Sequence, residues 1–298
     1  MPELPEVETI RRHLAPHVEG RTLERLAIHD ARWSLPLAPA ELSAAVEGRE
    51  VRRLGRRGKY LVWELAGDAF LLLHLRMTGT LLLRPRERPA HTRVTFDLGD
   101  GEVLFVDPRR FGTGELALGH EALEAFFTAR LGLEPLEAGF TGAHLHAIAR
   151  RCRAPVKAML LDQKRIAGVG NIYADEALFR ARVHPLRSAE RLTRAQCAAL
   201  RDAVVDSLEA GIEAKGATID DFRDPNGVSG TFQNQFLIHL REGQGCLNCG
   251  RTVRKLRAAG RGTYVCVRCQ PVPRKRRQAA AEASSRSIPV RSARTSSW

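Results

Sequence analysis

The chain has 298 residues, 44% of them hydrophobic, which is enough for two domains of ordinary size with real cores. Its formal net charge of +13 favours a polyanionic partner, nucleic acid first. It has no run of about 18 apolar residues and no basic-then-apolar start, so no membrane span or secretory signal is expected. A cytoplasmic protein is predicted, whose six cysteines are metal ligands or thiols rather than disulfides.

The first six residues, MPELPE, carry unusual chemistry for a chain terminus. Removal of Met1 would expose Pro2 as a secondary amine, and an α-amino group titrates near ~7.7–8.0, so part of it is nucleophilic at neutral pH. Such an amine condenses with an aldehyde to an iminium, which is an electron sink. Glu3 lies beside it and can transfer protons. The alternative is a plain helix start, because proline and acidic residues suit the first helical turn.

A helix over residues 6–18 is predicted because apolar residues recur at three- and four-residue steps, and Gly20 is a plausible stop. From residue 22 to 118 the pattern changes to short strands separated by Gly, Asp and Pro, which is typical of a β-sandwich or barrel. The predicted strands are 51–54, 60–65, 70–75, 80–83, 94–98 and 103–106.

After Pro135 the pattern becomes helical, with segments at 143–152, 156–161, 172–179 and 194–215. A turn at 166–171 contains two glycines and predicts either a phosphate site at the next helix N-terminus or a plain helix–helix turn. Cys152 and Cys197 lie in helical patterns and are expected to be buried thiols. Residues 216–235 have little periodicity, and a loop of this length is usually functional or disordered.

The strongest local signal is a pair of CxxC motifs separated by sixteen residues. This spacing fits a closed tetrahedral zinc ribbon that is folded by its metal. One structural zinc per chain is therefore expected, with Cys246, Cys249, Cys266 and Cys269 as ligands. Basic residues between the two motifs predict that this hairpin faces phosphate. The final segment, 272–298, is predicted to be a disordered basic tail.

Six motifs occur in one order along the chain. They are MPELPEVE (1–8), GKYL (58–61), HLRMTG (74–79), DPRRFG (107–112), GVGNIYADE (168–176) and the CxxC pair. Each is a weak or moderate signal alone, but the ordered series resembles bacterial formamidopyrimidine-DNA glycosylase, also called 8-oxoguanine DNA glycosylase. The motifs span nearly all of the chain that is expected to fold.

The resemblance implies a multidomain α+β fold: an N-terminal β-sandwich with a flanking helix (1–133), a helix–two-turn–helix domain (134–236) and a zinc-finger hairpin (237–271). The loop at 216–235 matches the segment that covers an everted base. The implied function is a monomeric, bifunctional enzyme of base excision repair in the bacterial cytoplasm, associated with the nucleoid. It would excise oxidised purines from double-stranded DNA and cleave the strand at the abasic site.

The resemblance also implies roles for four catalytic residues. In the family pattern the N-terminal proline, Pro2 here, attacks C1′ of the damaged nucleoside, and Glu3 assists ring opening by proton transfer. The iminium acidifies the C2′ proton, and β-elimination expels the 3′ phosphate with Lys59 as the assigned proton donor. Arg261 is assigned to a second, δ-elimination. Because a guanidinium is a poor acid, a phosphate clamp is an equal interpretation of Arg261.

Chemistry on a base requires the nucleotide to leave the stack. Met77, Arg109 and Phe111 match the family's three void-filling residues, although a core Met, a surface Arg and a core Phe are the alternatives. Side chains that fall where the family contacts DNA phosphates are His91, Arg153, Lys157, Asn171 and Arg261.

Two stretches depart from the family pattern. Thr231 stands where relatives often have Tyr, and residues 238–241 are Ile-His-Leu-Arg in place of Val-Tyr-Gly-Arg, which leaves the base preference open. An endonuclease VIII-type glycosylase is the near alternative, but Leu4 argues against it because such relatives usually begin Pro-Glu-Gly-Pro-Glu. The full catalytic set argues against a silent lesion-binding protein, and the N-terminal motif argues against a structural nucleoid protein.

Deleting residues 273–298 is expected to flatten the salt dependence of binding to undamaged duplex. From Pro271 to Trp298 the chain has seven Lys or Arg and one acid, Glu282. The slope of log K against log salt is about −0.9 per phosphate neutralised, so a segment that engages DNA contributes to it. Binding titrations at several salt concentrations, on the full and shortened chains, measure the slope. Equal slopes would show that this segment does not touch DNA.

Overall fold

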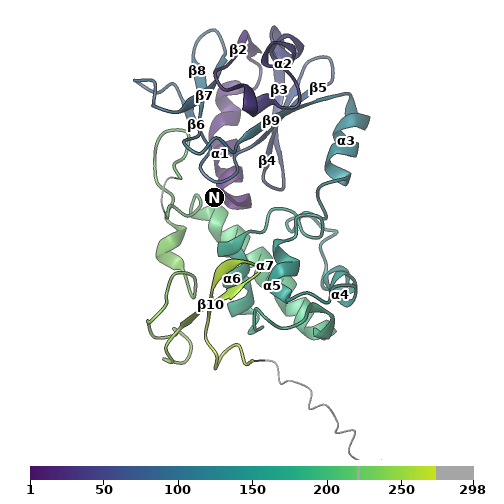
Figure 1. Cartoon of the computed structure of the whole chain (residues 1–298), viewed down its shortest axis with the longest axis vertical. Coiled ribbons are helices and arrows are strands. Elements are labelled where there is room, and N and C mark those ends of the chain that lie inside the picture. Colours follow the sequence, from purple (N-terminus) through teal and green to yellow (C-terminus); the bar gives the residue numbers. More distant parts are fainter. Residues whose placement is uncertain (220–221, 273–298) are drawn as a thin grey trace, which may run out of the picture.

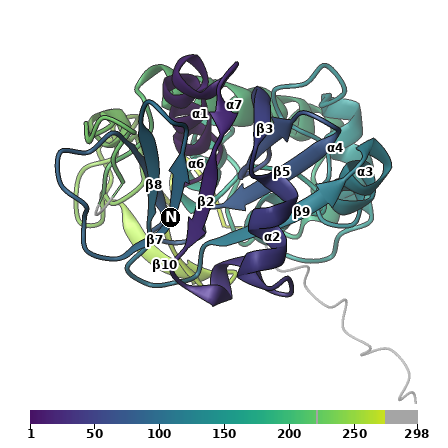
Figure 2. The ribbon, with the colours of Figure 1, turned by 90° about the horizontal axis from the view of Figure 1, so that it is seen from above.

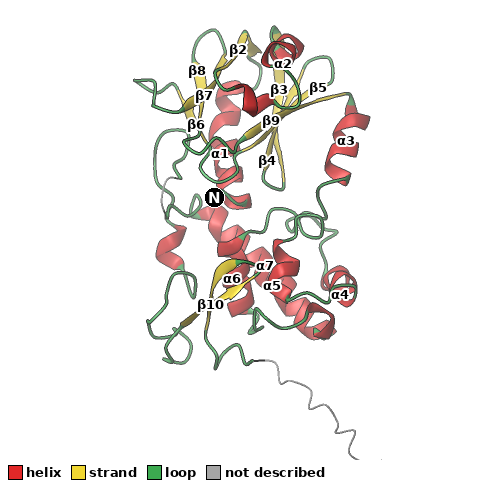
Figure 3. Ribbon diagram, viewed as in Figure 1, coloured by secondary structure: helices red, strands yellow, loops and turns green. Residues whose placement is uncertain are grey.

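The computed structural model describes residues 1–219 and 222–272. Two bodies lie end to end in Figure 1, and the N-terminus lies at their junction. Figure 3 shows strands in most of one body and helices in most of the other. None of the helices in these described ranges has the length and apolar character that crossing a membrane requires. The predicted disordered tail lies outside the described residues from residue 273 onward.

The N-terminal body is a β-sandwich, as predicted. Its strands are β1 (Thr22–Leu23), β2 (Arg25–Ile28), β3 (Arg49–Arg57), β4 (Tyr60–Leu65), β5 (Ala69–His74), β6 (Thr80–Leu83), β7 (Thr92–Asp97), β8 (Glu102–Val106) and β9 (Thr113–Leu118). They form two antiparallel sheets, with the orders β1-β3-β4-β5-β9 and β2-β7-β8-β6. Figure 2 shows β2, β7 and β8 grouped beside β3, β5 and β9. The core lies between them, where Trp63 stacks on Phe96 with ring centroids 5.0 Å apart.

Three helices accompany the sandwich: α1 (Leu4–Val18), α2 (Pro39–Val46) and α3 (His120–Thr128). The predicted first helix begins two residues early, because the Glu6 carboxylate accepts the N–H of Glu3 at 2.8 Å and caps the first turn. The short strands predicted between residues 22 and 118 are present, but the prediction did not include α2, which interrupts them. This helix buries only Leu42 and Val46, which is too short an apolar repeat to stand out from a strand pattern.

The second body contains α4 (Gly142–Arg150), α5 (Val156–Leu161), α6 (Asn171–Arg180) and α7 (Arg194–Glu213). These helices lie within about two residues of their predicted positions. Both α4 and α6 pack against α7, and α7 also packs against α1 of the sandwich. Cys152 and Cys197 are buried in the helical core, as expected. The first helix of the chain is therefore in contact with both bodies.

The C-terminal hairpin packs against α6 through its second strand. Its strands are β10 (Arg254–Ala258) and β11 (Arg261–Val265). The buried Glu176 carboxylate accepts the N–H groups of residues 237, 238 and 239 at 2.9–3.1 Å. Leu240 follows with φ +57°, a left-handed conformation that glycine adopts without strain. The family pattern has Gly at this position, so the departure places a strained, exposed leucine at the entry to the hairpin.

Residues 216–235 run between the two bodies and end in a 3-10 helix at Phe232–Gln235. The carbonyl of Pro225 accepts the N–H of Leu83 at 2.8 Å, and the carbonyl of Arg223 accepts the Thr80 hydroxyl at 3.0 Å. His13 Nδ1 lies 3.1 Å from a carboxylate oxygen of Asp224. This loop, whose residues 220–221 are not described, therefore reaches from the helical body to β6 and α1.

Candidate active site

Glu3 occupies the junction of the two bodies with only 2% of its surface exposed. Its carboxylate accepts the backbone N–H of Ile172 at 3.1 Å and, at a longer 3.5 Å, that of Tyr173. Both donors belong to the first turn of α6, where the helix dipole favours a negative charge. The residue chosen from the sequence as a proton carrier is thus held in one position by a helix from the other body.

The turn before α6 is shaped to receive the N-terminal segment. The N–H of Leu4 donates to the carbonyl of Gly168 at 3.1 Å. A Cβ on Gly170 would lie 2.1 Å from the Glu3 carboxyl carbon, and one on Gly168 would lie 2.5 Å from a Leu4 methyl. The two glycines admit residues 3 and 4, and the first turn of α6 directs the N–H groups of Ile172 and Tyr173 to a carboxylate of this chain. A phosphate contact at this turn stays a prediction, and these two N–H groups are occupied by Glu3.

Glu6 is a second buried carboxylate in the same region. One oxygen accepts the Tyr173 hydroxyl and the Ala217 N–H, both at 2.8 Å, and the other accepts the Glu3 N–H. Burial raises the pKa of Glu6, the charge of Glu3 adds to the shift, and the hydrogen bond from Ala217 opposes it. Glu6 therefore ties α1 to α6 and to the start of the 216–235 loop.

Lys59 lies in the turn between β3 and β4 and is 5% exposed. Glu134, which lies between α3 and α4, holds this turn in place. Its carboxylate accepts the Gly58 N–H and forms an ion pair with Arg56 at 3.0 Å. Burial lowers the pKa of Lys59 below its usual value, the charge of Glu3 opposes this shift, and Arg261 adds to it. Three of the catalytic candidates, at positions 3, 59 and 261 of the sequence, are therefore close enough for their charges to act on one another.

Arg261 begins β11, and its side chain is exposed. Asn171 at the start of α6 donates its amide to the carbonyl of Gly262 at 3.2 Å, which fixes the strand that carries Arg261. Arg153 is exposed on the helical body, with Glu190 at 3.8 Å. His91 is also exposed, at a left-handed φ of +69°.

Lys157 is placed differently from the other expected phosphate ligands. It is fully buried, and its Nζ donates to Asp175 Oδ1 and Thr263 Oγ1, both at 2.7 Å. Asp175 also accepts a hydrogen bond from His239 Nδ1 at 2.8 Å. In this structure Lys157 is not at the surface, so the expected direct phosphate contact does not fit its burial. It joins α5 and α6 to the C-terminal hairpin instead.

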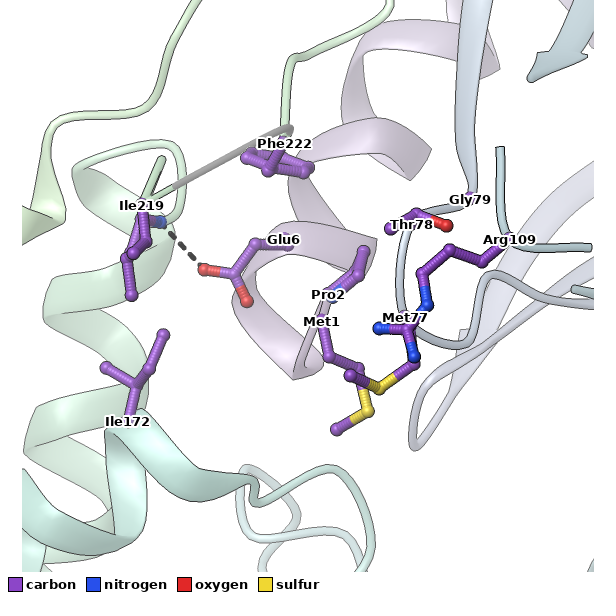
Figure 4. Close-up of a pocket in the computed structure, with 11 residues that line it drawn as sticks. Met1, Pro2, Glu6, Met77, Thr78, Gly79, Arg109, Ile172, Ile219 and Phe222 are labelled. Atoms are coloured by element: carbon purple, nitrogen blue, oxygen red, sulfur yellow. Dashed lines mark hydrogen bonds between the residues drawn. The ribbon is translucent and has the colours of Figure 1, made fainter. Parts of the chain in front are cut away.

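Two cavities meet at the N-terminus. One, of about 240 Å³, is lined by Pro2, Glu6, Met77, Arg109, Ile172, Ala217, Ile219 and Phe222 among others (Figure 4). The second, a groove of about 490 Å³, is lined by Lys59, His74, Phe111, Gly170, Asn171 and Arg261 among others. Met1 and Met77 line both, and Figure 4 shows their side chains close together. Pro2 is buried next to Glu3 and lines the first of these cavities.

His74 lines the groove but was not singled out from the sequence. Burial lowers its pKa to about 3, with Arg76 and Lys59 adding to the shift, so the ring is neutral at physiological pH. Its Nδ1 accepts the Arg76 N–H at 2.9 Å, so the hydrogen of the neutral ring is on Nε2. The signal available in the sequence was only its place at the start of the HLRMTG motif.

The four cysteines of the CxxC pair converge as predicted. Their sulfur atoms all lie within 4.8 Å of one another, with 3.8 Å between Cys246 and Cys269 and 3.5 Å between Cys249 and Cys266. Four ligands about 2.3 Å from one zinc place their sulfurs about 3.8 Å apart, so the geometry fits a tetrahedral ion. The chain binds one structural zinc here, and the metal orders the hairpin that carries Arg261.

The chain combines a β-sandwich, a helical domain and a zinc finger around one buried N-terminal segment. Comparison with known proteins shows that this is the architecture of a multidomain DNA glycosylase. Three family models match in chain order: the formamidopyrimidine-DNA glycosylase N-terminal domain at residues 1–114, its H2TH domain at 131–223, and the zinc finger found in FPG and IleRS at 243–272. The chain belongs to the formamidopyrimidine-DNA glycosylase family.

Similar proteins cover almost the whole chain. The formamidopyrimidine-DNA glycosylases of Halorhodospira halophila and Heliobacterium modesticaldum are 46% and 43% identical, each over 91% of this chain and 100% of the relative. The crystal structure of MutM (Fpg) from Thermus thermophilus is 41% identical with a TM-score of 0.82, over 90% of this chain and 98% of that one. A Lactococcus lactis Fpg complexed with DNA containing an abasic site has 33% identity and a TM-score of 0.85, over 91% and 100%.

Gly170→Ala is expected to lower base excision by about 100-fold or more, the range in which a positioned proton carrier acts. The new methyl group would displace the Glu3 carboxylate from α6, and the backbone at this position is not in the left-handed region. Single-turnover excision from lesion duplex measures the effect. Gly55→Ala is the matched control, because its Cβ would make only ordinary contacts at 3.8 Å. Equal activity of the two variants would contradict the role given to Glu3.

Proposed function

We propose that this protein is a bifunctional DNA glycosylase and AP lyase of base excision repair that excises oxidised purines, formamidopyrimidines and 8-oxoguanine, from duplex DNA. The observation that carries the proposal is that buried Pro2 lines the pocket, while Met1, the residue before it, lines both the pocket and the groove that contains Lys59 and Arg261. In this proposal an everted base occupies the pocket, and the flanking phosphates lie in the groove near Lys59 and Arg261. The sugar between them would then lie against Pro2.

In the proposed reaction, Met1 is removed and the Pro2 amine attacks C1′ of the damaged nucleoside. The bond from C1′ to the base breaks, and the departing base takes a proton from solvent. Glu3 takes the proton that the Pro2 nitrogen loses on attack and delivers it to the ring oxygen as the sugar ring opens, which leaves an iminium between Pro2 and C1′. The buried position of Glu3 beside Pro2, held by α6, supports this role.

Strand cleavage follows from the iminium. Loss of the C2′ proton and breakage of the C3′–O bond expel the 3′ phosphate, and a second, δ-elimination releases the 5′ phosphate. Lys59 is proposed as the proton donor to the first step, since its lowered pKa makes it a better acid than an exposed lysine. Arg261, exposed in the groove, is proposed to act in the second elimination or as a phosphate clamp.

The partner is proposed to be double-stranded DNA, bound by a single chain in the bacterial cytoplasm. Met77, Arg109 and Phe111 would fill the space that the everted nucleotide leaves, and the exposure of Arg109 and Phe111 supports this. His91, Arg153 and Asn171 are proposed as phosphate contacts. The 216–235 loop, which borders the pocket with Ala217, Ile219 and Phe222, is proposed to cover the base.

Borohydride is expected to lock the protein covalently to DNA that carries 8-oxoguanine or an abasic site. An iminium is reducible, and peptide mapping of the adduct should find it on Pro2 after loss of Met1. Pro2→Gly keeps a primary amine and should retain some trapping. Glu3→Gln should bind lesion duplex but excise poorly, because it keeps the shape and removes the proton carrier.

The decisive control is a protein with a residue retained ahead of Pro2. The nitrogen is then an amide without nucleophilicity, and both excision and strand cleavage should be lost. Full activity in a protein whose N-terminus is verified as blocked would show that Pro2 is not the nucleophile. Running 8-oxoguanine and an oxidised pyrimidine side by side distinguishes the proposed base preference from that of an endonuclease VIII-type enzyme.

Lys59→Met is expected to stabilise the fold at neutral pH while abolishing efficient strand cleavage. The pKa of Lys59 is lower in the folded state than in the unfolded chain, so burying the protonated amine reduces the free energy of unfolding at pH values below the folded-state pKa. This cost decreases as the pH rises from the folded-state pKa to the unfolded-state pKa, because the buried amine loses its proton. Methionine has a similar shape and no charge to desolvate. Thermal melts at pH 7 and near pH 10 test this: the gap between the two proteins should narrow at the higher pH. A less stable variant at pH 7 would contradict the argument.

A further inference from the structure

Asp107, directly after β8, is a fully buried carboxylate to which the proposed reaction gives no role. Oδ2 accepts the backbone N–H groups of Phe111 and Gly112, both at 2.8 Å. Oδ1 accepts the Thr78 hydroxyl at 2.5 Å and the Arg109 N–H at 3.2 Å. The charge is therefore satisfied by a ring of donors from two loops, 74–79 and 107–112.

The backbone of Asp107 extends the same connection to a third loop. Its N–H donates to the carbonyl of His91 at 3.1 Å, and its own carbonyl accepts Arg93 Nε at 2.9 Å. One buried residue thus contacts the loops that carry Met77, His91, Arg109 and Phe111. Each of these four side chains is a proposed DNA contact, and none of them packs in the buried core.

The two main loops also share a packing surface, the ring of Phe105. A Cβ on Gly112 would lie 2.3 Å from this ring, and one on Gly79 would lie 2.9 Å from it. Glycine at both positions lets each loop lie directly on Phe105. Within the second loop the Arg109 guanidinium lies 4.9 Å from the centre of the Phe111 ring, so these two side chains already form a pair.

We propose that Asp107 is a positioning residue that joins loops 74–79 and 107–112 into one unit, with the Thr78 hydroxyl as the link between them. Met77 then enters the duplex at the same time and in the same register as Arg109 and Phe111. A charge-assisted hydrogen bond of this kind is short and directional, which suits a fixed separation between two otherwise exposed loops. The inference rests on the proposed void-filling role of these three side chains.

Thr78→Val tests the link, because valine keeps the shape of threonine and lacks the hydroxyl. The measured quantity is the ratio of two rates: excision of 8-oxoguanine from duplex, which needs void filling, and borohydride trapping on single-stranded abasic DNA, which does not. The ratio is expected to fall about tenfold, the size of effect of one lost hydrogen bond to a charged group. Thr78→Ser keeps a hydroxyl and should restore the ratio, which a purely steric role of the side chain would not predict.

A spectroscopic measurement and a double-mutant cycle complete the test. A 2-aminopurine beside the lesion brightens when a wedge unstacks it, and this signal should be weaker in Thr78→Val than in Thr78→Ser. Met77→Ala should lower the rate ratio in the wild-type background and by clearly less in the Thr78→Val background, because the two loops act together.

The outcomes separate this inference from the function on which it rests. If Met77→Ala and Phe111→Ala lower the ratio but Thr78→Val does not, the loops act independently and the positioning role of Asp107 is overturned. The same conclusion follows if the loss from Met77→Ala is equal in both backgrounds. If neither Met77→Ala nor Phe111→Ala changes the ratio, the void-filling role itself fails, and the inference fails with it.

Discussion

The capture of the Glu3 carboxylate by the first turn of α6 is the interaction on which the rest of the site depends. It joins residues 169 positions apart and crosses from the sandwich to the helical body. Two neighbouring residues add hydrogen bonds across the same junction. The Leu4 N–H donates to the carbonyl of Gly168, and the Glu6 carboxylate accepts from Tyr173 and Ala217. Because a buried carboxylate is costly without such donors, the two bodies must meet at this junction for the N-terminal segment to be buried at all.

The same helix fixes the other end of the site. Asp175 and Glu176, one turn further along α6, are buried and hold the C-terminal hairpin through Lys157, His239 and three backbone N–H groups. His239 stands where the family pattern has tyrosine, and its Nδ1 forms a hydrogen bond to Asp175. One helix therefore sets the distance between Glu3 and the strand that carries Arg261, while zinc keeps the hairpin itself folded.

The sandwich contributes its residues through turns rather than through its core. Lys59 projects from the β3–β4 turn, which Glu134 of the linker holds in place, and Met77, Arg109 and Phe111 come from loops gathered around Asp107. Loops that carry function are usually mobile. A buried carboxylate that accepts several backbone N–H groups restricts such a loop to one conformation. The sheets support these turns and loops, and the carboxylates of Glu134 and Asp107 hold them in defined positions.

The sequence by itself determined what depends on local pattern. The zinc ligands followed from spacing, and β4, β6 and α5 followed from short apolar repeats whose ends are marked by glycine, proline or charge. The ordered motifs placed Pro2, Glu3 and Lys59 in one candidate site. Tertiary structure alone decided that Gly168 and Gly170 admit the N-terminal segment, that Lys157 is buried against Asp175, and that Asp107 joins two loops. These roles depend on hydrogen bonds between residues that are far apart in the sequence and are buried together in the protein interior, where an unpaired charge is costly. The local pattern of apolar and polar residues does not show which distant donor will bind which buried carboxylate.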